Sequence, residues 1–114
     1  MRRLIQTTAL CLALATHASA DIVYQGRDAQ ALHCAAMLAL AGALLYKSGK
    51  ITEERFMSGI NVSIKIMSQL PGSESEKQKA FDQRAEKIVR SRSLPQLKEE
   101  FTSTGKWCQR DFLR

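Results

Sequence analysis

Few side chains in this sequence could carry out chemistry, and His33 with Cys34 is the first candidate pair. A histidine beside a cysteine could bind a metal or act as the base and nucleophile of a thiol enzyme. Adjacent residues of a helix point about 100° apart, however, so these two side chains do not face each other. We therefore expect His33 to be a surface or half-buried polar residue rather than a catalytic residue or a metal ligand.

The other motifs of catalysis and cofactor binding are missing from the sequence. The carboxylate pairs Glu53-Glu54 and Glu99-Glu100 lie near predicted helix starts or on solvated faces. The chain has no glycine-rich phosphate loop and no C-x-x-C-H haem-attachment motif. It also lacks the C-x-x-C spacing that redox and zinc sites use. The sequence therefore predicts a protein that is not an enzyme and that binds no metal or other cofactor.

The first twenty residues have the three parts of a secretory signal peptide. Two arginines follow Met1, an apolar stretch covers residues 4–15, and the small residues A-S-A occupy positions 18–20. The apolar stretch is shorter than the roughly 20 residues that a membrane span needs. We expect cleavage after Ala20, no lipid on Cys11, and delivery to the periplasm of a Gram-negative bacterium.

Two cysteines, Cys34 and Cys108, remain after the signal peptide is removed, because Cys11 leaves with it. In an oxidising compartment two cysteines indicate one disulfide bond. This bond would close a loop of 75 residues and stabilise the fold by about 4 to 5 kcal/mol in the chain-entropy account. A metal-binding or reactive cysteine pair is the alternative interpretation.

The mature chain, residues 21–114, is expected to form one domain. It has 94 residues, of which 15 are basic and 11 acidic, so its formal net charge is +4. A chain of this length builds one modest core, and such a core often needs a covalent cross-link. The mild positive charge is ordinary for a small domain and gives only a weak expectation of acidic partners.

The stretch ALHCAAMLALAGALLY, residues 31–46, could be a membrane span or the core helix of a bundle. Apolar side chains recur at spacings of three and four, which predicts one apolar helix face: Cys34, Met37, Leu38, Ala41, Leu44 and Leu45. Small residues occupy the opposite side: Ala35, Ala39, Gly42 and Ala43. Asp28 is the predicted N-cap, and Gly49 the predicted left-handed residue at the C-terminus. Sixteen residues make a helix about 24 Å long, shorter than the roughly 30 Å hydrocarbon core, so we favour a core helix.

A second helix is predicted from its end signals, with Thr52 as its cap and Leu70 as its last residue before Pro71-Gly72. Its main apolar face contains Phe56, Met57, Ile60, Ile64, Met67 and Leu70, and Val62 and Ile66 widen this face. We expect the whole face to be buried against the first helix.

Two more helices complete the predicted fold. Ser73 and Glu76 form a capping-box pattern for a helix of about residues 74–92, whose apolar stripe is narrow. A fourth helix begins at Pro95 and ends at Gly105, and residues 106–114 add a final turn or two. The predicted fold class is therefore all-α, a small disulfide-stapled bundle of about four helices after a cleaved signal peptide.

The basic run KQKAFDQRAEKIVRSR, residues 77–92, is the one charge feature above background. Acidic residues are interleaved in it, so a solvated helix face is the first interpretation. The alternative is a partner-binding surface made by Arg84, Lys87 and Arg90, because arginine is favoured at interfaces. Trp107 could be its aromatic anchor, although packing beside the disulfide is the favoured role. We do not expect nucleic-acid binding, and contact with a membrane surface is not favoured.

Two families share the outline of this chain. The size, export signal, single disulfide and helical content resemble the periplasmic acid-stress chaperones, and WCQRDFL is similar to their Trp-Cys-Phe-Leu neighbourhood. The same outline resembles periplasmic immunity proteins. Neither resemblance carries a motif that assigns a family. The leading hypothesis is a non-enzymatic periplasmic binding or adaptor protein with a protein partner. The alternatives are a holdase-type chaperone, which would use Met37, Met57 and Met67, and an effector-immunity or inhibitor protein.

Overall fold

The computed structural model describes residues 22–113, so the predicted signal peptide lies outside the described residues. The helical segments are α2 (Gly26–Ala36), η1 (Met37–Ala41), α3 (Gly42–Lys47), α4 (Glu53–Gln69), α5 (Glu74–Ser91) and α6 (Leu94–Phe112). The first three are consecutive and form one helix with a π-helical segment in its middle. Between residues 22 and 113 there is no strand. This confirms the all-α prediction of a small bundle of four helices.

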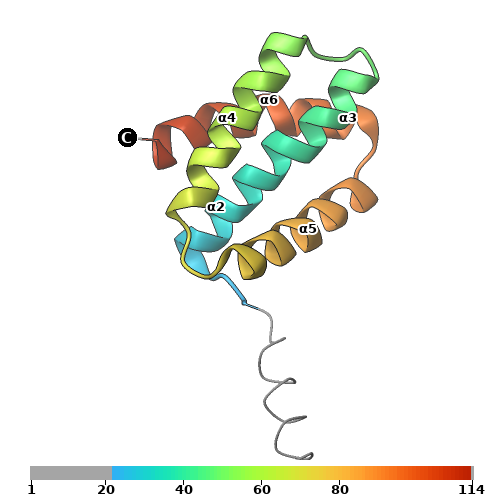
Figure 1. Ribbon diagram of the computed structural model, residues 1–114. Helices are drawn as coiled ribbons and strands as arrows, with labels where there is room; N and C mark the ends of the chain where they lie inside the picture. Colours follow the sequence, from blue (N-terminus) through green and yellow to red (C-terminus); the bar gives the residue numbers. More distant parts are fainter. Residues whose placement is uncertain (1–21, 114) are drawn as a thin grey trace, which may run out of the picture.

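The continuous helix from Gly26 to Lys47 is the centre of the molecule, and the other helices surround it (Figure 1). The predicted core face is confirmed, because five of its six residues are at most 3% exposed. Leu44 is the exception and is partly buried. The predicted N-cap at Asp28 is wrong: the cap position is Gln25, and Asp28 lies in the first turn. At the other end Gly49 has a φ of 70°, as predicted for a left-handed C-terminal residue.

The central helix is long and apolar enough to cross a membrane by length and composition alone. It has 22 residues with a mean hydropathy of 1.5 in its most apolar window, and 22 residues extend about 33 Å. The sequence-based expectation that this helix is too short to span a membrane therefore does not hold, because it counted only 16 residues. What favours a core helix is burial, since 56% of that window is covered inside the bundle.

The three outer helices cover different sides of the central helix. α4 and α5 pack against α2 and η1, while α6 contacts η1, α2 and α3 (Figure 1). α4 and α5 make at most marginal contact with each other. The central helix is therefore not enclosed on the side between α4 and α5.

Local capping explains where the outer helices begin. The Thr52 hydroxyl accepts a hydrogen bond from the Arg55 amide at 3.2 Å, which confirms the predicted cap of α4. The predicted capping box of Ser73 and Glu76 is present at α5. A second capping box, with Ser93 at the cap position, precedes α6 and was not predicted. Each box satisfies backbone amides that a helix start leaves without a partner.

The prediction that Gly105 ends the fourth helix is wrong, because α6 continues to Phe112. Gly105 has no positive φ and lies in mid-helix. The buried side chains of α6 recur at helical spacing on both sides of this glycine: Leu97, Phe101, Thr104, Cys108 and Phe112. Glycine costs a helix about 1 kcal/mol relative to alanine, and burial of this face outweighs that cost.

The predicted disulfide is present and joins the central helix to α6. The Cα atoms of Cys34 and Cys108 lie 5.9 Å apart, and both residues are fully buried. Because disulfides persist in oxidising compartments, this bond favours such a compartment for the protein.

The N-terminal lead, residues 22–25, is extended and attached to the loop between α4 and α5. The Tyr24 hydroxyl donates to the Pro71 carbonyl at 2.6 Å. A Cβ on Gly72 would lie 3.0 Å from the Ile22 side chain. The lead therefore closes one end of the bundle.

Candidate functional site

The buried face of α4 is not the face that the sequence predicts. α4 packs on the central helix through Gly59, Val62, Ser63 and Ile66. Gly59 permits this approach, because a Cβ there would lie 3.1 Å from the Leu38 carbonyl oxygen. The Ser63 hydroxyl fixes the register by donating to the buried Ala35 carbonyl at 2.9 Å.

As a consequence, part of the predicted core face of α4 is exposed. Ile64 is 62% exposed and Met57 is 47% exposed. Ile60 and Met67 are half-buried and lie on the same side of the helix. The predicted core face is therefore wrong for Met57 and Ile64, although Leu70 is buried and Phe56 and Met67 pack against the core. The predicted widening residues Val62 and Ile66 are buried.

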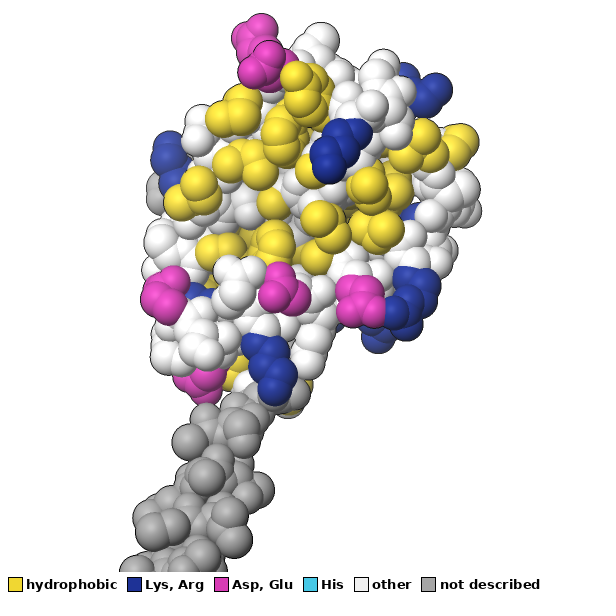
Figure 2. Space-filling view, turned by 45° about the vertical axis from the view of Figure 1, so that its right-hand side comes forward, with side chains coloured by type: hydrophobic (Ala, Val, Ile, Leu, Met, Phe, Trp, Pro, Cys, Tyr) yellow, Lys and Arg dark blue, Asp and Glu magenta, His cyan; other side chains and the backbone are white. Residues whose placement is uncertain are grey.

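The exposed stripe of α4 borders a groove that extends to α5. One part of the groove, about 390 Å³, has Ala39, Ile60 and Ile64 among its lining residues, with Phe81 opposite on α5. A second part, about 430 Å³, lies between Leu40 and Val89 and shares Phe81. We call this surface the apolar face and define it by Leu40, Met57, Ile60, Ile64, Met67, Phe81 and Val89. Figure 2 shows apolar side chains gathered over one side of the molecule.

The floor of the apolar face is the π-helical segment η1, which presents the small Ala39 and the exposed Leu40. Because Ala39 is small, the floor is lower than the flanking side chains of α4 and α5. π-helical turns are frequent at functional sites. The small residues predicted on one side of the central helix differ in exposure. Ala35 and Gly42 are buried in close helix contacts, whereas Ala39 and Ala43 are half-buried.

Charged side chains border the apolar face along α5, and acidic ones predominate: Glu74, Asp82 and Glu86, beside Lys77 and Arg90. Both cations are engaged, since Lys77 lies 3.7 Å from Glu74 and Arg90 pairs with Glu86. The Gln78 amide donates to Asp82 at 2.9 Å. Figure 2 shows both acidic and basic side chains at the margin of the apolar region, and a Lys or Arg side chain inside it.

The predicted basic surface of α5 does not form one patch. Arg84 is half-buried and lines a depression with Tyr24 and Leu32, which Lys87 also lines. Arg90 lines the apolar face on another side of the helix. α5 is also more buried than predicted, because Lys77 is only 9% exposed. Whether any of the three cations contacts a partner stays a prediction.

Trp107, the predicted aromatic anchor, is partly buried and packs against the core. Its ring centroid lies 6.2 Å from that of Phe112. Arg27 of α2 stacks over the Phe112 ring, with 4.7 Å between the guanidinium carbon and the ring centroid. This arrangement corresponds to the packing role that the sequence favours for Trp107.

His33 lies in a polar cluster that joins three helices. Its Nε2 is 3.4 Å from the Glu100 carboxylate of α6, and the same carboxylate accepts from Arg92 at 3.0 Å. Burial lowers the pKa of His33, and Arg84 and Arg92 lower it further, while Glu100 acts in the opposite direction. His33 is about a quarter exposed, so the predicted half-buried polar residue fits the structure. Sequence reasoning did not find its pairing with Glu100.

Within residues 22–113 no three His, Cys, Asp or Glu side chains come together in a way that could hold a metal ion. Glu53-Glu54 lies in the first turn of α4, as predicted, and Glu99-Glu100 lies in α6. The cysteines have formed the disulfide and offer no thiolate. His33 is the only histidine among residues 22–113, and its imidazole contacts the Glu100 carboxylate.

No protein-family model matches the chain, and neither the curated proteins nor the solved structures contain a match to it. The candidate site therefore depends on the geometry of this chain alone. One signal in the sequence could have indicated it. α4 carries apolar residues around more than half of its circumference, and a single neighbouring helix can cover only one side of such a helix.

Proposed function

We propose that this protein is an exported, non-enzymatic binding protein that takes up an amphipathic helix of a partner protein on its apolar face. The observation that carries the proposal is the exposure of Ile64 and Met57 beside a groove lined by Phe81 and Leu40. A contiguous exposed apolar surface on a small domain marks an interaction site. Grooves between two helices are a recurrent way to bind an apolar helix face.

The shape of the apolar face suits a helical occupant. Its floor is low at Ala39, and its walls are the bulky Ile60, Ile64 and Phe81. α4 and α5 do not close over the central helix, so the groove is open along its length. The partner helix would present apolar side chains at spacings of three, four and seven residues.

The border charges favour one class of partner. Along α5, the carboxylates Glu74, Asp82 and Glu86 are accompanied by the cations Lys77 and Arg90. The border therefore has a small acidic excess, and we expect the partner helix to carry lysine or arginine on the flank that faces α5. This excess opposes contact with an anionic membrane surface, which attracts basic segments. A symmetric dimer is also less favourable, since both copies would bring the same acidic border to the interface.

The location that fits this function is the periplasm of a Gram-negative bacterium. The predicted signal peptide of residues 1–20 supports export, and the Cys34–Cys108 disulfide supports an oxidising compartment. No catalytic role is proposed for the apolar face.

The proposal is tested by site-specific photocrosslinking in cells that export the full chain. A photoreactive residue replaces Ile64, or, as a control, Ser103 on the exposed surface of α6. We expect an adduct of one defined mass from Ile64 only, and the crosslinked segment should be an amphipathic helix with basic residues on one flank. Ile60→Asp should abolish this adduct, and Ser103→Asp should leave it unchanged.

Three outcomes would overturn the proposal. A crosslink between two copies of this chain would make the apolar face a dimer interface. Crosslinks to lipid, with binding to vesicles that contain phosphatidylglycerol, would make it a membrane-contact surface. Equal adducts from Ile64 and Ser103 would show that the face has no selective partner.

A holdase-type chaperone is the second candidate, and the side chains of Met57 and Met67 favour it. Methionine is flexible and is used on surfaces that bind several partners. Met37, the third methionine that the sequence suggested for this role, is fully buried and cannot contribute. Many unrelated adducts from Ile64, together with suppressed aggregation of an unfolded client, would support the chaperone over a dedicated partner.

A further inference from the structure

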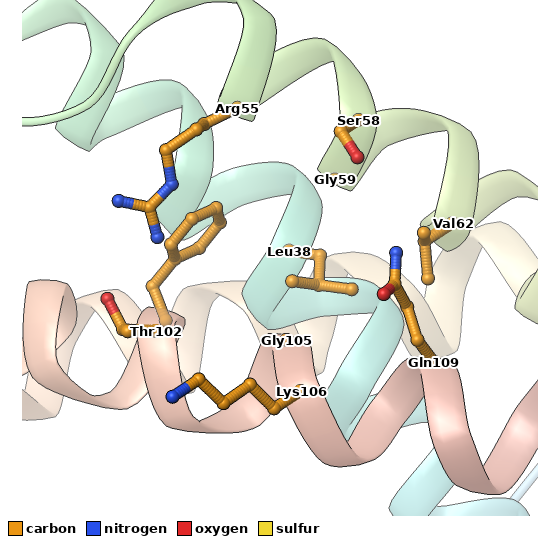
Figure 3. Close-up of a pocket in the computed structure, with 10 residues that line it drawn as sticks. Leu38, Arg55, Ser58, Gly59, Val62, Thr102, Gly105, Lys106 and Gln109 are labelled. Carbon is orange, nitrogen blue, oxygen red and sulfur yellow. The ribbon is translucent and has the colours of Figure 1, made fainter.

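A second groove, between α4 and α6, has a polar character that the apolar face lacks (Figure 3). Its volume is about 240 Å³, and its lining residues on α4 are Arg55, Ser58, Gly59 and Val62. On an angular spacing of about 100° per residue, these positions lie on the side of α4 opposite Met57 and Ile64. The α4–α6 groove is therefore separate from the apolar face.

One end of the groove is cationic. Arg55 of α4 and Lys106 of α6 extend toward it, and the Thr102 hydroxyl lies between them (Figure 3). The Arg55 guanidinium is placed over the Phe101 ring, 5.8 Å from its centroid. No Asp or Glu lines this groove, and neither cation forms an ion pair with an acidic residue of the described chain. Two cations at the same end of a groove that no carboxylate lines favour an anionic ligand.

The middle and the far end of the groove differ from the cationic end. Leu38 forms an apolar floor with Val62 and the Phe101 ring. At the far end, the Gln109 amide lies beside Val62, and Ser58 lies on the α4 wall between Arg55 and Val62 (Figure 3). A ligand would therefore meet the cations at one end of the groove and the Gln109 amide at the other, with Leu38 between them.

Two glycines give the groove its depth. Gly59 lies directly against the Leu38 carbonyl, and a Cβ on Gly105 would be 3.7 Å from the Leu38 side chain. Neither residue places a side chain over the apolar floor, so the groove reaches down to Leu38. Leu38 itself is 3% exposed and Phe101 4%, so the floor offers a ligand only a small apolar area.

We propose that the α4–α6 groove binds a small organic monocarboxylate with an apolar body, its carboxylate on Arg55 and Lys106. The planar guanidinium matches a carboxylate with two parallel hydrogen bonds, and Lys106 adds a second positive charge. The groove volume of about 240 Å³ is several times the roughly 30 Å³ that one water molecule occupies in the liquid, which leaves room for a small organic acid. Inorganic phosphate could also pair with Arg55 and Lys106, but it has no apolar body to place against Leu38, so we expect it to bind more weakly.

The test is a titration of the mature, disulfide-bonded protein with sodium benzoate, followed by NMR chemical shifts. Benzamide, which has the same shape without the charge, and inorganic phosphate are the comparison ligands. We expect saturable shifts at Gly59, Phe101 and Gly105 with a dissociation constant on the order of 1 mM, given the small number of ligand atoms. Benzamide and phosphate should bind at least about tenfold more weakly, since a charged hydrogen bond is the stronger one.

Matched variants distinguish binding in the α4–α6 groove from general attraction of benzoate to a positively charged protein. Arg55→Gln and Lys106→Gln should each weaken benzoate binding about tenfold or more. Lys98→Gln removes one positive charge elsewhere on α6 and should leave the affinity unchanged. If Arg55→Gln does not fold, Lys106→Gln still decides the question.

Four results would overturn the proposal: no saturation with benzoate, equal binding of benzamide, equal binding of phosphate, or equal weakening by Lys98→Gln. The partner-helix crosslink at Ile64 does not involve this groove. Failure of the carboxylate site would therefore leave the proposed function standing, and the reverse also holds.

Discussion

At the scale of single residues, His33 shows how neighbours on other helices set the behaviour of a side chain. It lies on α2, yet the groups that affect its pKa lie elsewhere. They are Glu100 on α6, Arg84 on α5 and Arg92 in the connection between α5 and α6. The Glu100 carboxylate contacts two side chains at once, at 3.4 Å from the His33 imidazole and 3.0 Å from the Arg92 guanidinium. The cluster therefore connects three helices by polar contacts at the edge of the core.

The lowered pKa of His33 predicts a loss of stability on acidification. The unfolded state keeps an ordinary histidine pKa near 6.5, so below that pH it binds more protons than the folded state. The free energy of unfolding should fall as the pH drops through about 6.5 and level off below the folded pKa. Urea unfolding of the mature protein measures this dependence.

A His33→Gln variant provides the control, because it keeps a polar side chain but does not titrate. We expect it to have a smaller change in unfolding free energy between about pH 7.5 and about pH 5.5 than the natural protein. Identical pH profiles for the two proteins would show that His33 titrates alike in the folded and unfolded states.

At the scale of the elements, the position of α4 on the central helix determines which of its apolar residues are buried. The close contact of Gly59 with the Leu38 backbone brings the two helices together, and Ser63 holds the register through Ala35. Once that side is packed, Ile64 and Met57 have no helix to cover them. The contact that forms the fold thus also creates the apolar face.

Two glycine substitutions in neighbouring helices should have opposite effects on stability. Gly59→Ala places a methyl group 3.1 Å from a backbone oxygen that is held in a helix, so we expect a net loss of about 1 kcal/mol from overpacking. Gly105→Ala meets only ordinary contact at 3.7 Å and should gain up to about 1 kcal/mol from helix propensity. Chemical denaturation of the two variants measures both effects.

The outcomes of these two substitutions test different statements. Stabilisation by Gly59→Ala would mean that α4 moves away from the central helix without cost, and that the close approach does not fix its orientation. Destabilisation by Gly105→Ala would contradict a continuous α6.

At the scale of the whole molecule, one covalent bond connects the start of the described chain with its end. Cys34 and Cys108 are 74 positions apart and lie on helices that pack across the core. A second connection at this end is made by Arg27, which donates to the Asp111 carbonyl. The Tyr24–Pro71 hydrogen bond attaches the lead to the middle of the chain. Each helix forms from contacts between residues that are near in sequence, and these long-range contacts hold the helices together.

Loss of the disulfide should destabilise the protein strongly. The chain-entropy account predicts a cost of about 4 to 5 kcal/mol for a loop of this length, against a total stability of about 5 to 15 kcal/mol for a typical domain. We expect the Cys34→Ser/Cys108→Ser double variant to melt far below the oxidised protein, as followed by circular dichroism. A reductant should lower the melting temperature of the natural protein and leave the double variant unchanged. Equal melting temperatures for the oxidised protein and the double variant would remove the proposed stabilisation.

The local features of the fold could be predicted from the sequence because they depend on residues a few positions apart. The caps at Thr52 and Ser73 and the left-handed Gly49 follow from short-range hydrogen bonding and steric freedom. The core face of the central helix follows from its apolar periodicity. The cysteine pair could also be predicted, because only two cysteines lie outside the predicted signal peptide.

Tertiary structure alone decided which apolar surface stays open and which polar side chains meet. Periodicity shows that α4 is apolar on several sides, but only its packing through Gly59 selects Val62 for the core and leaves Ile64 outside. Arg55 and Lys106 are 51 positions apart in the sequence, and they share a groove because α4 and α6 lie together against the central helix. The physical reason is that helix propensity and capping act within one or two turns, whereas the relative rotation of packed helices depends on the contacts of all of them at once.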